Sequence, residues 1–597
     1  MTDARLHRIV GSLAEVRPLP DARLYDLVRV GERRLMGEVI RIDGDLATVQ
    51  VFEETGGLRV GEPVASTGGP LVAQLGPGLL GSVLDGVGRP LAALAEAHGA
   101  WMRPGAEAPS LDPERRLDFE ASRTAGDEVE AGDVLGEVEV GPDRRLPLLV
   151  PPGRRGRLAS LESGSFGPDD PLGELDDGEP LALAHRWPVR TPRPFVRKLR
   201  GDRPLVTGQR VFDLLFPVAE GGAVALPGGF GTGKTVIEQS LARFAEADVV
   251  VYVGCGERGN EMAEMLSEFP ELEDPATGGS LMERSVLVVN TSNMPVVARE
   301  ASVYLGVTIA ESFRDMGLRV AVLADSLSRW AEALREIGAR LGEMPGEEGY
   351  PTTLASRLGR LTERAGRVRC LGRPERDGAL TLVSALSPPG GDFSEPVTQA
   401  ALRVSGALWA LDASLAHQRQ FPAVDWSGSY SLYADALAPW LHEHVGEAWS
   451  ARRRDLLALL EREQELREIA GLVGPEALED ADRLRLQVAR MAREIVIGQS
   501  AFDPADAFSP LEKTLALASL VHAVHEAGRQ ALEAGRTLEE LDLPGARRAL
   551  AAVRDAPEEE RETRFQEALG HVARIDPGEA AAPPRRAAAD DDEEEAP

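Results

Sequence analysis

The chain has 597 residues, which is too long for one hydrophobic core, so we expect three or more domains. It contains no apolar run long enough for a transmembrane helix, and its N-terminus lacks the apolar core of a signal peptide. The two cysteines, Cys255 and Cys370, indicate no disulfide framework and suit a reducing cytosol. The formal net charge of −31 repels phosphate backbones and therefore disfavours a nucleic-acid motor.

Short strand-like runs separated by turn signals fill the first part of the chain. Leu35 to Ile42 and Leu46 to Phe52 flank an Asp-Gly-Asp turn, which predicts two neighbouring antiparallel strands. We therefore predict an N-terminal β-barrel over residues 1–70, followed by a connector rich in glycine and proline over residues 71–110.

The next block, residues 111–190, contains repeated Gly-Asp turns between alternating residues. Such hairpins resemble those of lipoyl or biotinyl carrier domains, which need a lysine on a hairpin tip. The first lysine of the chain is Lys198, so a carrier function is rejected. The block is predicted to be a β-rich structural module.

Strands and helices alternate over residues 191–426, which predicts a parallel sheet with helices on both faces. The helical stretches include Val296 to Met316 and Leu327 to Leu341. The strand-like runs are Ala223 to Leu226, Val249 to Val253, Ser285 to Val289, Val320 to Ala324 and Leu380 to Leu386.

The remainder of the chain is predicted to be helical over residues 427–575, with Trp449 to Ala470 and Leu511 to Ala534 as long amphipathic segments. Residues 576–597 turn to Ala, Pro and Arg and then to a run of acids, which predicts a disordered acidic tail. The predicted fold class is therefore multidomain α/β, with a barrel, a β-rich insert, a parallel-sheet domain and a C-terminal helical domain.

The strongest chemical motif is G-G-F-G-T-G-K-T, which satisfies the pattern of a phosphate-binding loop. Its glycines let backbone N–H groups surround phosphate oxygens, and the helix that follows adds its positive end. Lys234 can neutralise the β- and γ-phosphates, and the Thr235 hydroxyl can bind Mg²⁺. The expected nucleotide-binding residues here are Gly228, Gly229, Phe230, Gly231, Thr232, Gly233, Lys234, Thr235 and Val236.

Carboxylates that follow two other strands are expected beside this loop. Asp325 ends an apolar strand in the manner of a metal-binding carboxylate, although an acid here could also cap the helix after Ser326. Glu257 follows another strand and is the candidate to orient the attacking water. Arg258 could stabilise phosphate charge or position Glu257; the alternative for both residues is an exposed ion pair on a turn.

Several motifs together resemble the catalytic A subunit of V/A-type rotary ATPases. The resemblance covers nearly the whole chain except the acidic tail, and the order and spacing of the motifs agree with that family. The segments that carry it are 228–235, 256–261, 320–330, 344–351, 387–393 and 421–426.

The resemblance implies a RecA-like nucleotide domain that binds ATP or ADP with Mg²⁺. It implies that Glu257 polarises the attacking water and that Lys234 and Arg258 bind phosphate. It also implies that Asp325 holds Mg²⁺ through water and that Phe421 stacks on adenine, the alternative for Phe421 being plain burial in the core.

The resemblance further implies partners and a place in the cell. Such subunits alternate with B subunits in a ring of six, contact central-stalk and peripheral-stalk subunits, and drive a membrane sector that moves protons or sodium ions. Residues 344–350 would face the rotating shaft, and the ring would lie on the cytoplasmic face of the membrane. The alternatives are a secretion-type ring ATPase and a non-catalytic nucleotide-binding ring subunit.

Overall fold

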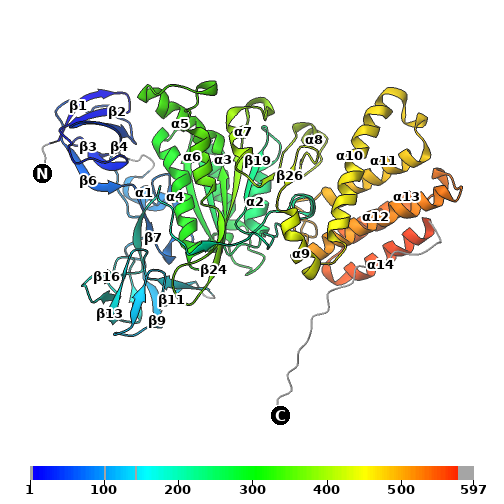
Figure 1. Cartoon of the computed structure of the whole chain (residues 1–597), viewed down its shortest axis with the longest axis horizontal. Helices are drawn as coiled ribbons and strands as arrows, with labels where there is room; N and C mark the ends of the chain where they lie inside the picture. The colour runs from blue at the N-terminus through cyan, green and yellow to red at the C-terminus, as the bar shows by residue number, and fades with distance from the viewer. Residues whose placement is uncertain (1–3, 100–102, 142–143, 576–597) are drawn as a thin grey trace, which may run out of the picture.

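The computed structural model describes residues 4–99, 103–141 and 144–575. The predicted acidic tail, 576–597, lies outside the described residues. Four parts follow one another along the chain: a β-barrel, a β-rich insert, a domain built on a large sheet, and a helical domain (Figure 1). The barrel and the helical domain lie at opposite ends of the sheet domain (Figure 1).

The N-terminal part is a six-stranded antiparallel sheet in the order β1-β2-β5-β4-β3-β6. A bridge between Arg5 and Pro63 brings its two edges together, which closes the sheet into a barrel. Alternate side chains point inward and form a separate apolar core. Its strands are β1 (Arg5–Val10), β2 (Leu13–Arg17), β3 (Asp26–Val30), β4 (Leu35–Asp43), β5 (Leu46–Val51) and β6 (Val64–Pro70).

The insert consists of two four-stranded sheets around a second small core, ordered β10-β13-β15-β16 and β12-β11-β9-β14. Strand β17 (His185–Pro188), which leaves the insert, pairs antiparallel with β7 (Val72–Leu75), which follows the barrel. The strands of the insert are β9 (Leu117–Ala121), β10 (Glu128–Glu130), β11 (Val134–Gly141), β12 (Arg144–Leu149), β13 (Arg155–Leu161), β14 (Gly164–Phe166), β15 (Gly173–Leu175) and β16 (Pro180–Leu181).

The central sheet has ten strands, and the run β25-β19-β24-β22-β20-β21-β8 is parallel throughout. Its edge strand β8 (Val83–Asp85) comes from the segment that was expected to be a connector, which also holds helix α1 (Leu91–His98). The other strands are β18 (Arg197–Lys198), β19 (Ala223–Pro227), β20 (Val249–Glu257), β21 (Ser285–Thr291), β22 (Arg319–Asp325), β23 (Gly366–Arg369), β24 (Asp377–Leu386), β25 (Ala407–Leu408) and β26 (Tyr430–Ser431).

Helices cover both faces of this sheet, as the continuous apolar strands require. Val250 and Tyr252 of β20 pack into one core with α2 and α3, whereas Val249, Val251 and Val253 pack into another with α4 to α7. The helices of this domain are α2 (Lys234–Phe244), α3 (Gly259–Glu268), α4 (Val296–Asp315), α5 (Leu327–Leu341), α6 (Leu354–Thr362), α7 (Pro396–Leu402) and α8 (Ala413–His417).

The C-terminal part is helical and shares the first of those cores. Among the described residues, no helix is both long and apolar enough to cross a membrane. The barrel, the insert, the parallel-sheet domain and the helical domain together confirm the predicted multidomain α/β architecture. The helices are α9 (Ala434–His444), α10 (Trp449–Val473), α11 (Asp480–Ala492), α12 (Leu511–Glu533), α13 (Leu543–Arg554) and α14 (Glu558–Ile575).

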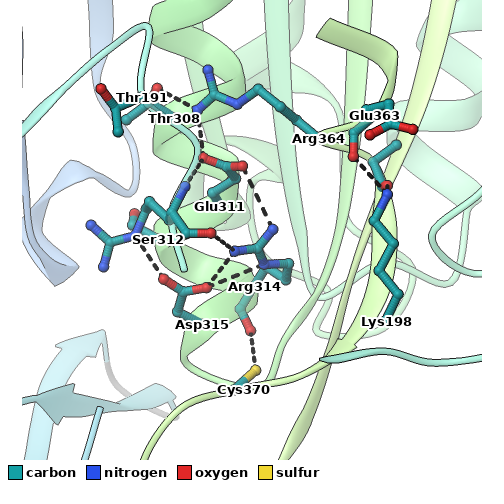
Figure 2. Close-up of polar contacts among 12 residues, drawn as sticks. Thr191, Lys198, Thr308, Glu311, Ser312, Arg314, Asp315, Glu363, Arg364 and Cys370 are labelled. Carbon is teal, nitrogen blue, oxygen red and sulfur yellow. Dashed lines mark hydrogen bonds and ion pairs between the residues drawn. The ribbon is translucent and has the colours of Figure 1, made fainter. Parts of the chain in front are cut away.

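A network of buried ion pairs lies at the C-terminal end of α4. It binds the segment after the insert, which contains Arg193, to the sheet domain. Figure 2 shows Glu311 contacting Arg364 and Asp315 contacting Arg314. Asp315 also accepts from Arg193 Nε at 2.7 Å, and the Arg193 backbone N–H donates to Glu311 at 3.1 Å. Because all five side chains are buried, each charge depends on its partners to offset the loss of water.

Replacing Glu311 with Gln should lower the free energy of unfolding by about 3–5 kcal/mol, since the buried Arg364 would lose its charged partner. Urea denaturation measures this change. The control is Glu560→Ala on α14, which removes an exposed ion pair with Arg564 and should cost about 0–1 kcal/mol. Equal effects for the two variants would contradict the role given to the network.

Candidate functional site

The phosphate-binding loop connects β19 to α2, as its sequence predicts. Gly231 and Gly233 have φ of 75° and 86°, in the left-handed region that favours glycine, so backbone N–H groups can turn toward one concave surface. The Thr232 hydroxyl donates to the carbonyl of Gly229 at 2.9 Å and braces the loop. No side chain caps the N-terminus of α2, so its free N–H groups remain available to an anion.

Lys234, the first residue of α2, lies over the carboxyl end of β24. Its Nζ donates to the Leu386 carbonyl at 3.1 Å and to the Ser387 hydroxyl. The Ser387 N–H in turn donates to Ser328 Oγ at 2.9 Å on α5. Lys234 is thereby held at the edge of the sheet where β19, β20, β22 and β24 end.

Asp325 is the last residue of β22 and is buried beside this lysine. The Tyr252 hydroxyl donates to its Oδ2 at 3.4 Å. Burial raises the pKa of Asp325, while the positive charge of Lys234 opposes the rise. The lysine thus favours the ionised carboxylate that a metal would need.

Glu257 ends β20, the neighbour of β22 in the sheet. Burial raises the pKa of Glu257 to about 7, and the negative charge of Asp325 adds to the rise, whereas Lys234 and Arg329 lower it. A carboxyl group with a pKa near neutrality can accept or donate a hydrogen bond to water at working pH, which suits a water-orienting group.

Arg258 follows Glu257 and is exposed. Its guanidinium carbon lies 5.3 Å from the ring centroid of Phe230, at the tip of the phosphate-binding loop, and its nitrogen lies 3.6 Å from Glu261. A contact with the Phe230 ring and an exposed ion pair with Glu261 therefore hold the Arg258 guanidinium beside the loop. An exposed ion pair on this turn was the alternative expected from the sequence.

Sequence reasoning missed Glu238, which lies four residues after Lys234 on the same face of α2. Its side chain is 1% exposed, and neither carboxylate oxygen has a hydrogen-bond partner among the described residues. Burial, and then the nearby Asp325, raise the pKa of Glu238 well above its usual range. The spacing of four from Lys234 was the one signal that could have identified it.

The residues at this edge fit a magnesium ion. The Thr235 hydroxyl is exposed and makes no hydrogen bond within the described chain, and the carboxylate of Asp325 lies on the neighbouring strand end. Ser326 Oγ, next to Asp325, is buried without a partner in the same part of the molecule. Within the described ranges, no group of three or more His, Cys, Asp or Glu forms a protein cage for a metal. Few protein ligands and room for water suit Mg²⁺, which sheds its waters reluctantly.

A cavity of about 440 Å³ opens beside the loop, between α2 and the segment that follows α11. Phe421 is 47% exposed on its wall, so its ring is not part of the core. Phe502, which sequence reasoning missed, is 87% exposed on the same wall. Exposed aromatic rings beside a phosphate loop can stack on a flat nucleobase.

Buried polar contacts fix the far wall of this cavity to the sheet domain. Arg210 is fully buried and donates to the Val496 carbonyl at 3.0 Å and to Asp506 at 2.6 Å. Lys513 is also buried and donates to the Ala505 carbonyl at 2.9 Å. Arg210 thus ties the wall to the sheet domain and Lys513 ties it to α12, and removing either cation would leave its buried partners unsatisfied.

Burial, and next the charge of Arg210, lower the pKa of Lys513 from 10.5 to about 8. Between these two pH values the unfolded chain binds more protons than the folded chain, so Lys513 makes the free energy of unfolding rise with pH. Relative to Lys513→Met, the wild type should gain up to about 1.4 kcal/mol per pH unit in this window. Urea denaturation of both proteins from pH 8 to 10 measures the slope, and parallel profiles would contradict it.

The fold and the site together define a P-loop nucleotide-binding protein of the type found in ring-shaped ATPases. Four family models match successive parts of the chain. They are the ATP synthase alpha/beta family beta-barrel domain at residues 6–68, the ATP synthase alpha/beta subunit barrel-sandwich domain at 108–190, the ATP synthase alpha/beta family nucleotide-binding domain at 208–431, and the C-terminal domain of V and A type ATP synthase at 438–541.

Individual relatives agree with these models. The chain is 57% identical over 530 residues to a V-type ATP synthase alpha chain of Anaeromyxobacter dehalogenans strain 2CP-1, covering 89% of this chain and 91% of that one. It is 48% identical over 571 residues to an A-type ATP synthase A subunit of Methanospirillum hungatei JF-1, covering 95% and 97%. The assembled ATPase EscN of the enteropathogenic Escherichia coli type III secretion system has a similar fold, with a TM-score of 0.62, 22% identity, and coverage of 87% and 99%.

This chain belongs to the family of V-type and A-type ATP synthase alpha (A) subunits. The resemblance inferred from the motifs is confirmed, and so is the nucleotide-binding nature of the domain around the phosphate loop. The 22% identity to the secretion ATPase shows a common fold alone.

Proposed function

We propose that this chain is the catalytic subunit of a V/A-type rotary ATPase, which hydrolyses or synthesises ATP at the carboxyl edge of its parallel sheet. The observation that carries the proposal is the convergence of Lys234, Glu257 and Asp325 on that edge. The pKa values of both acids respond to the charge of Lys234, so the three groups act on one another. A subunit that only bound nucleotide would not need the carboxyl group that orients water.

Lys234 exchanges its bonds to Leu386 and Ser387 for the β- and γ-phosphate oxygens, and the loop N–H groups bind the same phosphates. Glu257 accepts a hydrogen bond from the attacking water and aligns its oxygen with the γ-phosphorus. As the water oxygen forms its bond to the γ-phosphorus and its proton passes to Glu257, the bond between that phosphorus and the β,γ-bridging oxygen breaks, and ADP leaves with that oxygen. Arg258 adds positive charge to the phosphate side, and Phe421 holds the adenine ring.

The Thr235 hydroxyl and, through water, Asp325 would hold Mg²⁺, which neutralises the charge that builds up on the phosphate oxygens. The Tyr252 hydroxyl orients the carboxylate of Asp325 from within the core. Catalysis of this kind consists chiefly of positioning and charge stabilisation, so small displacements of these groups reduce the rate strongly.

Family membership supports an assembly of several subunits. We propose that B subunits alternate with this chain in a ring of six and supply an arginine to the transition state. Residues 344–350 would face the central stalk, peripheral-stalk subunits would hold the ring, and a membrane sector would move protons or sodium ions. The ring would lie on the cytoplasmic face of the membrane.

The variant Glu257→Gln should bind Mg-ATP but hydrolyse it at least about 100-fold more slowly, because the amide cannot take a proton from the attacking water. Turnover is measured with the chain reconstituted with its B-subunit partner. Glu264→Gln is the matched control, since it removes an exposed acid on the same helix, α3, that contacts none of these groups within the described chain, and it should change turnover less than about twofold. Wild-type turnover by Glu257→Gln would refute its role, and wild-type binding without turnover would refute the catalytic assignment.

A further inference from the structure

Arg419 lies on the wall of the 440 Å³ cavity, two residues before Phe421. Its side chain is exposed and makes no hydrogen bond or ion pair within the described part of the chain. Its φ is 59°, in the left-handed region that glycine adopts readily and arginine does not. An unpaired cation therefore occupies a strained backbone position at this cavity.

The acidic residues that line the same cavity have other hydrogen-bond or ion-pair partners, and none of them pairs with Arg419. Asp506 pairs with Arg210 at 2.6 Å, and Asp555 pairs with Arg554 at 2.6 Å. Asp503 accepts from the backbone N–H of Ala505 at 3.0 Å. The free guanidinium of Arg419 is left as a hydrogen-bond donor for whatever fills the cavity.

The place of Arg419 separates it from the phosphate end of the site. The phosphate loop meets the cavity at Gly233, where the ring of Phe421 would lie 3.8 Å from an added Cβ. The backbone around Arg419 is fixed, because Gln420 donates to the Arg493 carbonyl at 3.2 Å and the Gln499 N–H donates to the Phe421 carbonyl at 2.9 Å. The backbone that carries Arg419 is therefore fixed on the side of the cavity where Phe421 lies.

We propose that Arg419 recognises the nucleoside end of the bound nucleotide, donating hydrogen bonds to the ring nitrogens of a purine that lies in this cavity beside Phe421. A guanidinium only donates, so it matches the acceptor nitrogens N1, N3 and N7 of the purine rather than an amino group. This inference rests on the proposed function, because it requires ATP in this cavity. It adds a selectivity determinant to a site whose phosphate end accepts any polyphosphate.

The test compares the affinities of Mg-ATP and of magnesium tripolyphosphate for the full chain by isothermal titration calorimetry. Arg419→Gly removes the side chain and relieves the strained φ, so the backbone is preserved. ATP affinity should fall about tenfold and tripolyphosphate affinity should not change. Arg403→Ala is the matched control, since Arg403 is exposed, makes no hydrogen bond or ion pair within the described chain and lies outside the cavity, and both affinities should stay at the wild-type value.

Unchanged ATP affinity in Arg419→Gly would overturn the inference. An equal loss for ATP and for tripolyphosphate would also overturn it, because Arg419 would then act on phosphate. If the wild type binds ATP no more tightly than tripolyphosphate, the nucleoside adds no affinity. The inference then fails, and the phosphate site is still supported. If the wild type binds neither ligand, the proposed function fails and takes this inference with it.

Discussion

The parallel direction of β19, β20, β22 and β24 is the constraint on which the site depends. Parallel strands end at the same edge of a sheet, so the residues that follow them meet there although they are far apart in the sequence. Lys234, Glu257, Asp325 and Ser387 come together for this reason. Burial at that edge then raises the pKa values of both acids, and the lysine restrains the rise. The chemistry thus follows from strand direction and burial together.

A second constraint joins two domains into one binding site. The phosphate loop belongs to the sheet domain alone, whereas the cavity beside it needs the segment after α11 as its outer wall. Arg210 and Lys513 hold that wall through buried contacts. Because breaking a buried ionic contact costs several kcal/mol, the contacts of Arg210 stabilise this arrangement of the two domains.

The sequence predicted the parts of the fold whose signals are local. Helix Leu327–Leu341 was predicted with its observed bounds, and the phosphate loop was identified from eight consecutive residues. Local sequence patterns did not predict the features that depend on contacts between distant segments. Strand β8 has three residues and no pattern of its own, so its place at the sheet edge follows only from pairing with β21. Phe502 lies in a loop far from Phe421 in the sequence, and only the folded cavity brings the two residues to one wall.

The proposed catalytic role requires that the edge formed by these strands binds the phosphates of ATP through Lys234. The most direct measurement is calorimetric titration of Mg-ATP into the wild-type chain and into Lys234→Ala. The wild type should bind Mg-ATP, and the variant, although folded to the same extent by circular dichroism, should bind at least about tenfold more weakly, because a charged contact to phosphate is lost. Equal affinity in the two proteins would contradict this role and would place the nucleotide somewhere else on the molecule.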